Sequence, residues 1–269
     1  MEHRARKRFG QNFLADPQIV NRIIAAIAPR PGEVIVEIGP GQAALTRPLV
    51  ESGAELHLLE IDRDLAALLQ RQFDGRPGVR LHLGDALQVD FAELCGGRRF
   101  RLVGNLPYNI STPLLFHVLQ WSRLVVDMHF MLQQEVVERM AAGPGGKARG
   151  RLSVMCQYHC AVTPLFTVPP QAFRPAPRVH SALVRLVPHA HPPVRVRDPA
   201  RFERLVAQAF SMRRKTLRNS LRALLDAEQI AAAGVDPGLR ADWLGKTSRE
   251  RPPHVTVNRD RRRRPHAAG

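Results

Sequence analysis

Four consecutive residues, Asn105-Leu106-Pro107-Tyr108, combine side chains that could grip a flat, hydrogen-bonding ring. The amide of Asn105 can donate and accept hydrogen bonds, and Tyr108 offers an aromatic face. Pro107 restricts the backbone between them. This combination is suited to holding a nucleobase. A plain turn is the alternative interpretation, because Asn and Pro are common turn formers and Tyr often caps a core.

Three more positions that could bind a ligand follow predicted strands. Gly39-Pro40-Gly41 lies between an apolar run and a predicted helix, where glycine lets the backbone approach a ligand closely. Glu60 and Asp85 each end another predicted strand. Because the carboxyl ends of parallel strands meet at one edge of a sheet, we expect Glu60, Asp85 and Asn105 to line one crevice. Glu60 could accept from both ribose hydroxyls and Asp85 from an adenine amino group, which would make a nucleoside site.

The glycine turn leaves other interpretations open. Its spacing, Gly39-x-Gly41-x-x-Ala44 with Glu60 about twenty residues later, loosely fits a dinucleotide fingerprint, so a nicotinamide or flavin enzyme is a rival. A tight turn without a ligand is the structural alternative. No Lys-Ser or Lys-Thr follows the glycines, which excludes a P-loop. Several strand-end signals in register favour a nucleoside site with no provision for pyrophosphate.

The elements that must position these residues alternate between short strands and helices, which predicts a parallel sheet covered on both faces. The predicted strands are Val34–Ile38, Leu56–Ile61, Val79–Leu83, Phe100–Val103 and Val125–Leu132, with two late strands at Val162–Val168 and Ala182–Val187. The predicted helices are Gln18–Ala28, Ala44–Glu51, Asp64–Phe73, Leu114–Leu124, Gln133–Ala142 and Leu152–Ala161. Asp16-Pro17 is expected to cap the first helix.

The composition shifts after Pro188. We predict a linker over His189–Pro193, followed by helices at Pro199–Phe210, Arg214–Leu225 and Ala227–Ala233. The predicted domains are therefore a ligand-binding α/β domain over 1–188 and a small α-helical domain over 189–247. Residues 248–269 contain four consecutive arginines and no apolar period, which predicts a basic disordered tail.

The charge favours a polyanionic partner, nucleic acid first. The 269 residues carry a formal net charge of +16, and residues 189–269 hold 18 Arg and Lys against 8 Asp and Glu. Three cysteines make a disulfide framework improbable and indicate a reducing compartment, here the cytoplasm. Cys156 and Cys160 are expected on one helix face as buried thiols rather than metal ligands, and no metal site is predicted. No membrane span or secretory leader is expected.

Short motifs run in order over residues 10–225. They are Gly10-Gln11-Asn12-Phe13-Leu14, Val36-Glu37-Ile38-Gly39-Pro40-Gly41, Glu60-Ile61-Asp62, Gly84-Asp85-Ala86, Gly104-Asn105-Leu106-Pro107-Tyr108, Phe173-Arg174-Pro175 and Arg213-Arg214-Lys215. With them the chain resembles the ribosomal RNA adenine dimethyltransferase family, specifically its small-subunit branch. Ala43 stands where a third glycine is often seen, a change that we expect to be tolerated. The likeness is expected to fade after about residue 240.

The resemblance implies a Rossmann-like class I methyltransferase sheet with S-adenosylmethionine as methyl donor. It implies dimethylation of N6 on two adjacent adenosines near the 3′ end of small-subunit (16S) rRNA in the assembling 30S subunit, by a monomeric enzyme. The implied cofactor contacts are Asn12, Leu14, Gly39, Gly41, Glu60, Ile61, Asp85, Ala86 and Asn105. The implied catalytic and base-holding residues are Asn105, Leu106, Pro107, Tyr108 and Phe173. The implied RNA contacts are Arg213, Arg214, Lys215, Arg218 and Arg222.

Two alternatives share most of these motifs. One is the large-subunit (23S), antibiotic-resistance branch of the same family, which would recognise a different RNA. The Phe173-Arg174-Pro175 motif and the basic block from Arg213 favour the small-subunit branch. The other is a non-catalytic assembly or transcription factor on the same fold. Such a protein could lose the Asn105-Leu106-Pro107-Tyr108 motif, which is intact here.

Overall fold

The computed structural model describes residues 11–107, 110–212 and 214–245. The chain divides into two compact units. Unit 1 runs to Ala141 and resumes over Leu152–Arg195, and unit 2 takes Ala142–Arg151 and the chain from Val196 onward. Unit 2 therefore includes a loop that the sequence analysis assigned to the first domain. The boundaries of independently folding domains stay a prediction, because compactness alone does not demonstrate independent folding.

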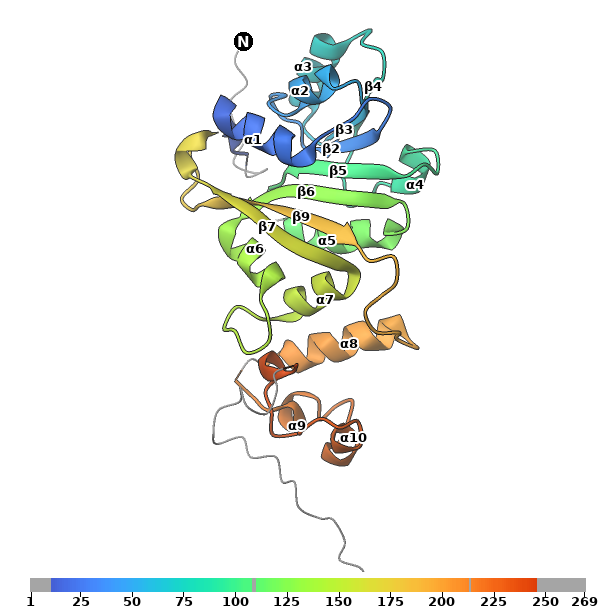
Figure 1. The fold of residues 1–269 in the computed structure, drawn as a ribbon, viewed down its shortest axis with the longest axis vertical. Helices are drawn as coiled ribbons and strands as arrows, with labels where there is room; N and C mark the ends of the chain where they lie inside the picture. The colour runs from blue at the N-terminus through green and yellow to red at the C-terminus, as the bar shows by residue number, and fades with distance from the viewer. Residues whose placement is uncertain (1–10, 108–109, 213, 246–269) are drawn as a thin grey trace, which may run out of the picture. The chain divides into compact units, whose positions relative to one another are not determined.

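A seven-stranded sheet forms the centre of unit 1 (Figure 1). Its order is β4-β3-β2-β5-β6-β9-β7. The strands are β2 (Val34–Ile38), β3 (Glu55–Glu60), β4 (Val79–Leu83), β5 (Phe100–Asn105), β6 (Val125–Gln133), β7 (Cys160–Val168) and β9 (Ser181–Pro188). The first five run parallel, which confirms the predicted parallel sheet. Of the two late strands, β9 runs antiparallel to β6, and β7 pairs antiparallel with β9, so β7 runs in the same direction as the five parallel strands.

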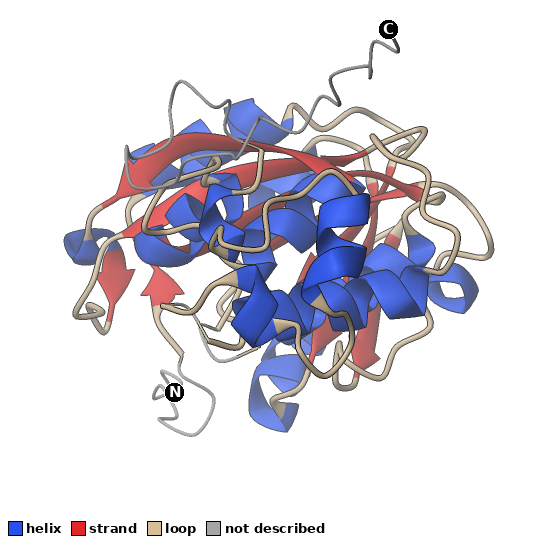
Figure 2. Ribbon diagram, turned by 90° about the horizontal axis from the view of Figure 1, so that it is seen from below, coloured by secondary structure: helices blue, strands red, loops and turns tan. Residues whose placement is uncertain are grey.

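Helices cover both faces of this sheet, as the strands and helices of Figure 2 show. They are α1 (Pro17–Ile27), α2 (Thr46–Glu51), α3 (Arg63–Phe73), α4 (Phe91–Leu94), α5 (Ser111–Val118), α6 (Gln134–Ala141) and α7 (Arg151–His159), with 3-10 turns η2 (Leu119–Trp121) and η3 (Pro170–Ala172). Successive residues of β2 face opposite layers: Val34 and Val36 pack with α5 and α6, and Ile35 packs with α1 and α2. This alternation makes a three-layer α/β/α arrangement.

Helix α1 begins as predicted. The Asp16 carboxylate accepts from the backbone N–H of Gln18 at 2.8 Å, and Pro17 occupies the first turn, where its missing N–H costs nothing. Just before it, β1 (Phe13–Leu14) pairs antiparallel with β8 (Phe173–Arg174) in a separate two-stranded sheet. This pairing joins the start of the chain to the segment between β7 and β9.

Three local predictions are wrong. Cys156 lies in α7 but Cys160 begins β7, so the two thiols do not share a helix face, although both are buried. The helix expected over Leu114–Leu124 is shorter: α5 ends at Val118 and tightens into η2. The helix expected over Arg214–Leu225 is reduced to α9 (Leu217–Ser220). Thr216 accounts for the late start, because its backbone is extended and bridges Arg240, and the Leu217 N–H donates to the Leu239 carbonyl at 2.7 Å. Asp226 then begins α10 (Ala227–Ala232) with a capping box.

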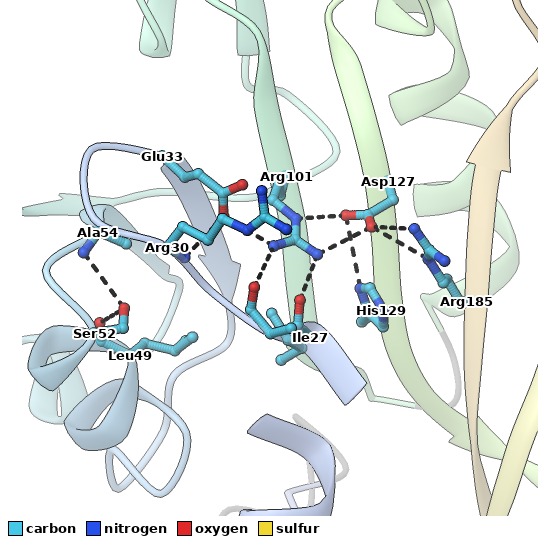
Figure 3. Close-up of polar contacts among 11 residues, drawn as sticks. Ile27, Arg30, Glu33, Leu49, Ser52, Ala54, Arg101, Asp127, His129 and Arg185 are labelled. Atoms are coloured by element: carbon cyan, nitrogen blue, oxygen red, sulfur yellow. Dashed lines mark hydrogen bonds and ion pairs between the residues drawn. The ribbon is translucent and has the colours of Figure 1, made fainter. Parts of the chain in front are cut away.

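A buried ion cluster lies at the amino ends of β5 and β6 (Figure 3). The Arg101 guanidinium donates to both Asp127 carboxylate oxygens, at 2.7 and 3.0 Å, and to the Ile27 carbonyl at 2.6 Å. Arg101 also donates to Glu33 at 2.9 Å, and Arg185 of β9 donates to Asp127 at 3.1 Å. The cluster satisfies carbonyl groups at the end of α1 and fastens that helix to three strands.

Unit 2 is a small helical assembly with its own core. Its helices are α8 (Pro199–Phe210), α9, α10 and the 3-10 turn η4 (Ala241–Trp243). Buried apolar side chains from these elements, including Leu217, Leu221 and Ile230, pack together. The loop 142–151 belongs to the same unit, since the Gly145 N–H donates to the Asp242 carbonyl at 2.6 Å.

Candidate nucleoside-binding site

A pocket opens at the carboxyl ends of the parallel strands, where the sequence places its strand-end residues. All nine predicted cofactor contacts line it: Asn12, Leu14, Gly39, Gly41, Glu60, Ile61, Asp85, Ala86 and Asn105. Leu106 and Pro107 line it as well. Three carboxyl side chains face this pocket, and no Lys, Arg or His from the described part of the chain lines it. Its electrostatics therefore favour a cationic ligand and disfavour an anionic pyrophosphate.

The turn between β2 and α2 needs glycine at the pocket wall. Gly39 and Gly41 have φ of 65° and 58°, in the left-handed region where a side chain is strained. A Cβ at position 41 would also lie 3.1 Å from the Phe13 ring. Ala43 adopts φ of 67° without being glycine, so the turn also carries a strained backbone at this position.

Glu60 is held rigidly at the end of β3. One of its carboxylate oxygens accepts from the backbone N–H groups of Ile61 and Asp62, at 3.0 and 2.9 Å, and the other accepts from Gly41 at 3.2 Å. Burial raises the pKa of Glu60 above its usual value, while these backbone hydrogen bonds oppose the rise. Three donors thus fix the carboxylate in a buried wall of the pocket, as an acceptor for ligand hydroxyl groups needs.

Glu37 is a pocket residue that the sequence analysis did not single out as a site residue. Its side chain is buried, lines the pocket and accepts from the Thr46 hydroxyl at 2.7 Å. Burial raises its pKa to about 7, the Thr46 hydrogen bond opposes that rise, and the nearby Glu60 adds to it. An acid inside an otherwise apolar strand is the sequence signal that could have identified it.

Asn105 ends β5 with its amide oriented. Its Nδ2 donates to the Asn12 carbonyl at 2.8 Å, so the amide oxygen Oδ1 points away from that contact. The preceding Gly104 is required by space, because a Cβ there would lie 2.7 Å from the Ile38 carbonyl oxygen. The Leu106 N–H donates to the Met131 carbonyl at 3.2 Å and fixes the turn. Tyr108 lies outside the described residues.

Asp85 and Ile61 form the opposite end of the pocket. Asp85 Oδ1 accepts from the Leu87 N–H at 2.9 Å, which orients the carboxylate after β4. Ile61 is 47% exposed and lines the pocket, so a ligand there can cover its apolar side chain. An apolar surface beside a carboxylate suits a purine ring that carries an amino group.

Two groups of predicted residues do not line this pocket. Phe173 is only 1% exposed and packs in the core beside Leu14, its partner in the β1–β8 pairing. The predicted RNA contacts belong to unit 2, where Arg214, Lys215, Arg218 and Arg222 are exposed. Arg213 lies outside the described residues. Within 11–107, 110–212 and 214–245 there is no group of three metal-ligating side chains and no helix long and apolar enough to cross a membrane.

The comparisons with known proteins agree with this geometry. The family model described as "Ribosomal RNA adenine dimethylase" matches residues 2–247, further than the resemblance was expected to reach. The protein named "Ribosomal RNA small subunit methyltransferase A" from Pseudomonas putida is 58% identical over 90% of this chain and 91% of its own length. Its namesake from Pseudomonas aeruginosa is 57% identical, with the same shares covered.

Two solved structures share the fold. A dimethyladenosine transferase from Plasmodium falciparum has a TM-score of 0.66 and 26% identity over 82% of this chain and 78% of its own. The 23S rRNA methyltransferase ErmE has a TM-score of 0.67 and 27% identity over 84% of this chain and 92% of its own. The sheet and the pocket at its strand ends define a protein of the Rossmann-like class I methyltransferases. Within that class, the chain belongs to the ribosomal RNA adenine dimethylase family.

Proposed function

We propose that this enzyme transfers methyl groups from S-adenosylmethionine to N6 of two adjacent adenosines near the 3′ end of small-subunit (16S) rRNA. The observation that carries the proposal is the pocket at the strand ends, with three carboxyl groups and no cationic side chain from the described residues. A pocket of this charge suits a sulfonium and disfavours the pyrophosphate of a nicotinamide or flavin dinucleotide. Family membership and relatives named for the small subunit support the same substrate.

The residues present fit this cofactor. Glu60 offers two oriented oxygens to ribose hydroxyls, and Asp85 beside Ile61 offers an acceptor and an apolar face to adenine. Gly39 and Gly41 leave the backbone open where a ligand would approach. When bound, S-adenosylmethionine supplies a methyl group that is already activated by the positive sulfur. The protein therefore needs to position the acceptor rather than activate the donor.

Asn105 and Leu106 are the groups that we propose to act on the target amino group. The adenine N6 lone pair is delocalised into the ring, which makes it a poor nucleophile. If Asn105 Oδ1 and the Leu106 carbonyl each accept one N6 hydrogen, the nitrogen is drawn towards a tetrahedral shape and its lone pair becomes available. The contact between Asn105 Nδ2 and the Asn12 carbonyl holds the amide in the required orientation. The methylated nitrogen is acidic and can lose its proton to water.

The extruded base needs an aromatic partner, and we propose Tyr108 for that role. Stacking of a base on an aromatic ring is worth about 1–3 kcal/mol. Phe173 was predicted to share this role, but its ring is almost fully buried beside Leu14. Phe173 can contact the base only if β8 shifts when RNA binds, and we retain it as a proposal on that condition.

Two alternative functions are less well supported. The large-subunit branch is represented by ErmE, whose 27% identity is well below the 58% of the small-subunit relative. A non-catalytic factor would not need the Asn105-Leu106-Pro107 turn at the pocket, yet all three residues line it. We further propose that the protein acts as a monomer in the cytoplasm on the assembling 30S subunit, consistent with its net charge of +16.

The decisive experiment measures methyl transfer from labelled donor to unmethylated small subunits and to free 16S rRNA, with the modified bases mapped. We expect two adjacent dimethylated adenosines near the 3′ end of the RNA. Asn105→Ala should lower kcat at least about 100-fold while much of the RNA affinity remains. Asn21→Ala, which removes an exposed amide on α1, is the matched control and should stay active. Full activity of the Asn105 variant would refute the mechanism.

A further inference from the structure

Strand β8 and its connection to β9 carry two arginines whose role the pocket does not explain. Arg174 and Arg178 are both exposed, and neither pairs with a carboxylate among the residues that the structure describes. The surrounding segment, residues 160–188, contains three arginines and no Asp or Glu. The third arginine, Arg185, is engaged by Asp127 at 3.1 Å. The other two positive charges are therefore presented to solvent without local neutralisation.

Both ends of this connection are fastened beside the candidate site. Arg174 is the direct partner of Phe13 in the β1–β8 pairing, which brings their Cα atoms to about 4.5–5.5 Å, and Phe13 lines the pocket. At the other end, the His180 carbonyl accepts from the Gln134 N–H at 3.0 Å, directly after β6. Strand β6 pairs with β5, the strand that ends in Asn105. Figure 1 shows the yellow turn η3, which directly precedes β8, beside the start of α1, and the Ala15 N–H donates to the Ala172 carbonyl there at 2.8 Å.

We propose that Arg174 and Arg178 form a phosphate clamp that holds the RNA backbone on either side of the target adenosine. The proposal rests on the proposed function and names a part of its RNA-binding surface in the catalytic unit itself. A base that enters a pocket must leave its stack, so the flanking backbone has to be held while the base is out. Guanidinium groups suit this task because they bind phosphate oxygens in pairs.

The surface beside Arg178 also carries an exposed apolar side chain. Val179 is 45% exposed next to Arg178, which puts an apolar side chain in an otherwise cationic connection. Ribose and base faces can cover such a side chain while the arginines take the phosphates. The connection therefore provides charge and apolar surface together, next to the strand end where the base would be methylated.

The test uses the full-length enzyme and unmethylated small subunits, over a range of about 50–200 mM salt. The variants are Arg174→Gln, Arg178→Gln and the double substitution. We expect KM to rise about three- to tenfold for each arginine, kcat to stay within about twofold, and the slope of log(kcat/KM) against log[salt] to weaken by about one per arginine. Arg174→Lys and Arg178→Lys should recover most of the salt slope, since lysine keeps the charge.

Arg76→Gln is the matched control. Arg76 is also exposed and lies in the turn before β4, at the amino ends of the parallel strands and away from the pocket, so its substitution should leave KM unchanged. A double variant with the KM and salt slope of the unmodified enzyme overturns the clamp. A fall in kcat alone, with KM and salt slope unchanged, also overturns it. If the unmodified enzyme itself methylates neither subunits nor 16S rRNA, the proposed function has failed instead, and the two failures are distinguishable.

Discussion

Three carboxyl groups, Glu37, Glu60 and Asp85, set the character of the pocket at the scale of single residues. Two of them are buried, at 2% and 4% exposure for Glu37 and Glu60, and burying acids so close together is costly unless a ligand compensates. Each is oriented by a hydrogen bond from a neighbouring hydroxyl or backbone N–H group. A positively charged ligand would supply that compensation, whereas a pyrophosphate would add to the repulsion.

The affinity of the pocket for a positively charged ligand should depend on pH through Glu37. Its pKa of about 7 means that its negative charge appears as the pH rises through neutrality. We therefore expect the affinity for S-adenosylmethionine to increase between about pH 6 and pH 8, by severalfold, in calorimetric titrations. Glu37→Gln keeps an acceptor for Thr46 but has no charge to gain, so its affinity at pH 8 should be lower and its pH dependence flatter.

A matched ligand sharpens the Glu37 measurement. S-adenosylhomocysteine has a neutral sulfur, so its affinity should depend less on Glu37 ionisation than that of S-adenosylmethionine. The same pH dependence in Glu37→Gln as in the unmodified protein would contradict the assignment. Glu60 and Asp85, the other acids that line the pocket, are present in both proteins.

At the scale of elements, the cluster around Asp127 ties α1 to β5, β6 and β9. Asp127 is 2% exposed, and this burial by itself raises its pKa. Hydrogen bonds from Arg101 and Arg185 outweigh the burial, so the pKa of Asp127 lies below its usual value. His129 lies beside it on β6, 3.7 Å away. Burial lowers the pKa of His129 to about 4; the Asp127 carboxylate opposes this shift, and the positive charges of Arg101 and Arg185 add to it.

This arrangement predicts a loss of stability in mild acid. The pKa of His129 is depressed in the folded state, so between about pH 6.5 and pH 4 the unfolded chain binds the extra proton and stability falls as the pH falls. His129→Leu cannot take up that proton. We therefore expect the free energy of unfolding of the unmodified protein to fall by about 2 kcal/mol more than that of the variant when the pH is lowered from 7 to 5. Urea titrations of both proteins at the two pH values measure this difference.

Titrating groups that the unmodified protein shares with His129→Leu contribute to both free energies of unfolding. Glu37 acts with the opposite sign, since its raised pKa makes the folded state bind the extra proton between about pH 4.5 and pH 7. It is present in both proteins and cancels in the difference. Parallel pH profiles of the two unfolding free energies would show that His129 does not titrate as inferred.

At the scale of the whole molecule, the pocket and the exposed basic residues around α9 belong to different units. The pocket residues belong to unit 1, and the exposed basic residues around α9 belong to unit 2. Unit 2 also includes the loop 142–151, which lies in the sequence between two stretches of unit 1. The Arg151–Glu203 ion pair at 2.7 Å helps to hold this loop in unit 2. The chain therefore passes between the units more than once, and a simple linker does not describe their connection.

This division predicts separable defects. Arg214→Gln combined with Lys215→Gln should weaken RNA binding about tenfold at moderate salt and reduce the salt dependence by about two, with cofactor affinity unchanged. Filter binding across a salt series and calorimetry with the cofactor measure the two effects. Glu228→Gln, an exposed change on α10, is the control and should not weaken RNA binding. Loss of cofactor affinity with intact RNA affinity would contradict the division.

The sequence by itself determined the sheet and the residues at its strand ends. Val34–Ile38 and Val79–Leu83 are strands with the predicted bounds, because short β-branched and apolar runs between turn residues carry a local signal. The strand-end rule then brought Gly39, Glu60 and Asn105 into one pocket, since the ends of parallel strands meet at one edge. Both inferences use only local patterns and a topological rule.

Tertiary structure alone decided the features that depend on contacts between distant segments. It buries Phe173 against Leu14, sets Glu37 beside Glu60, and leaves Arg174 without a carboxylate partner among the described residues while Arg185 has one. It also delays the start of α9 to Leu217, because the extended Thr216 bridges the distant Arg240. Burial and pairing are set by residues far apart in the chain, so no local pattern could specify them.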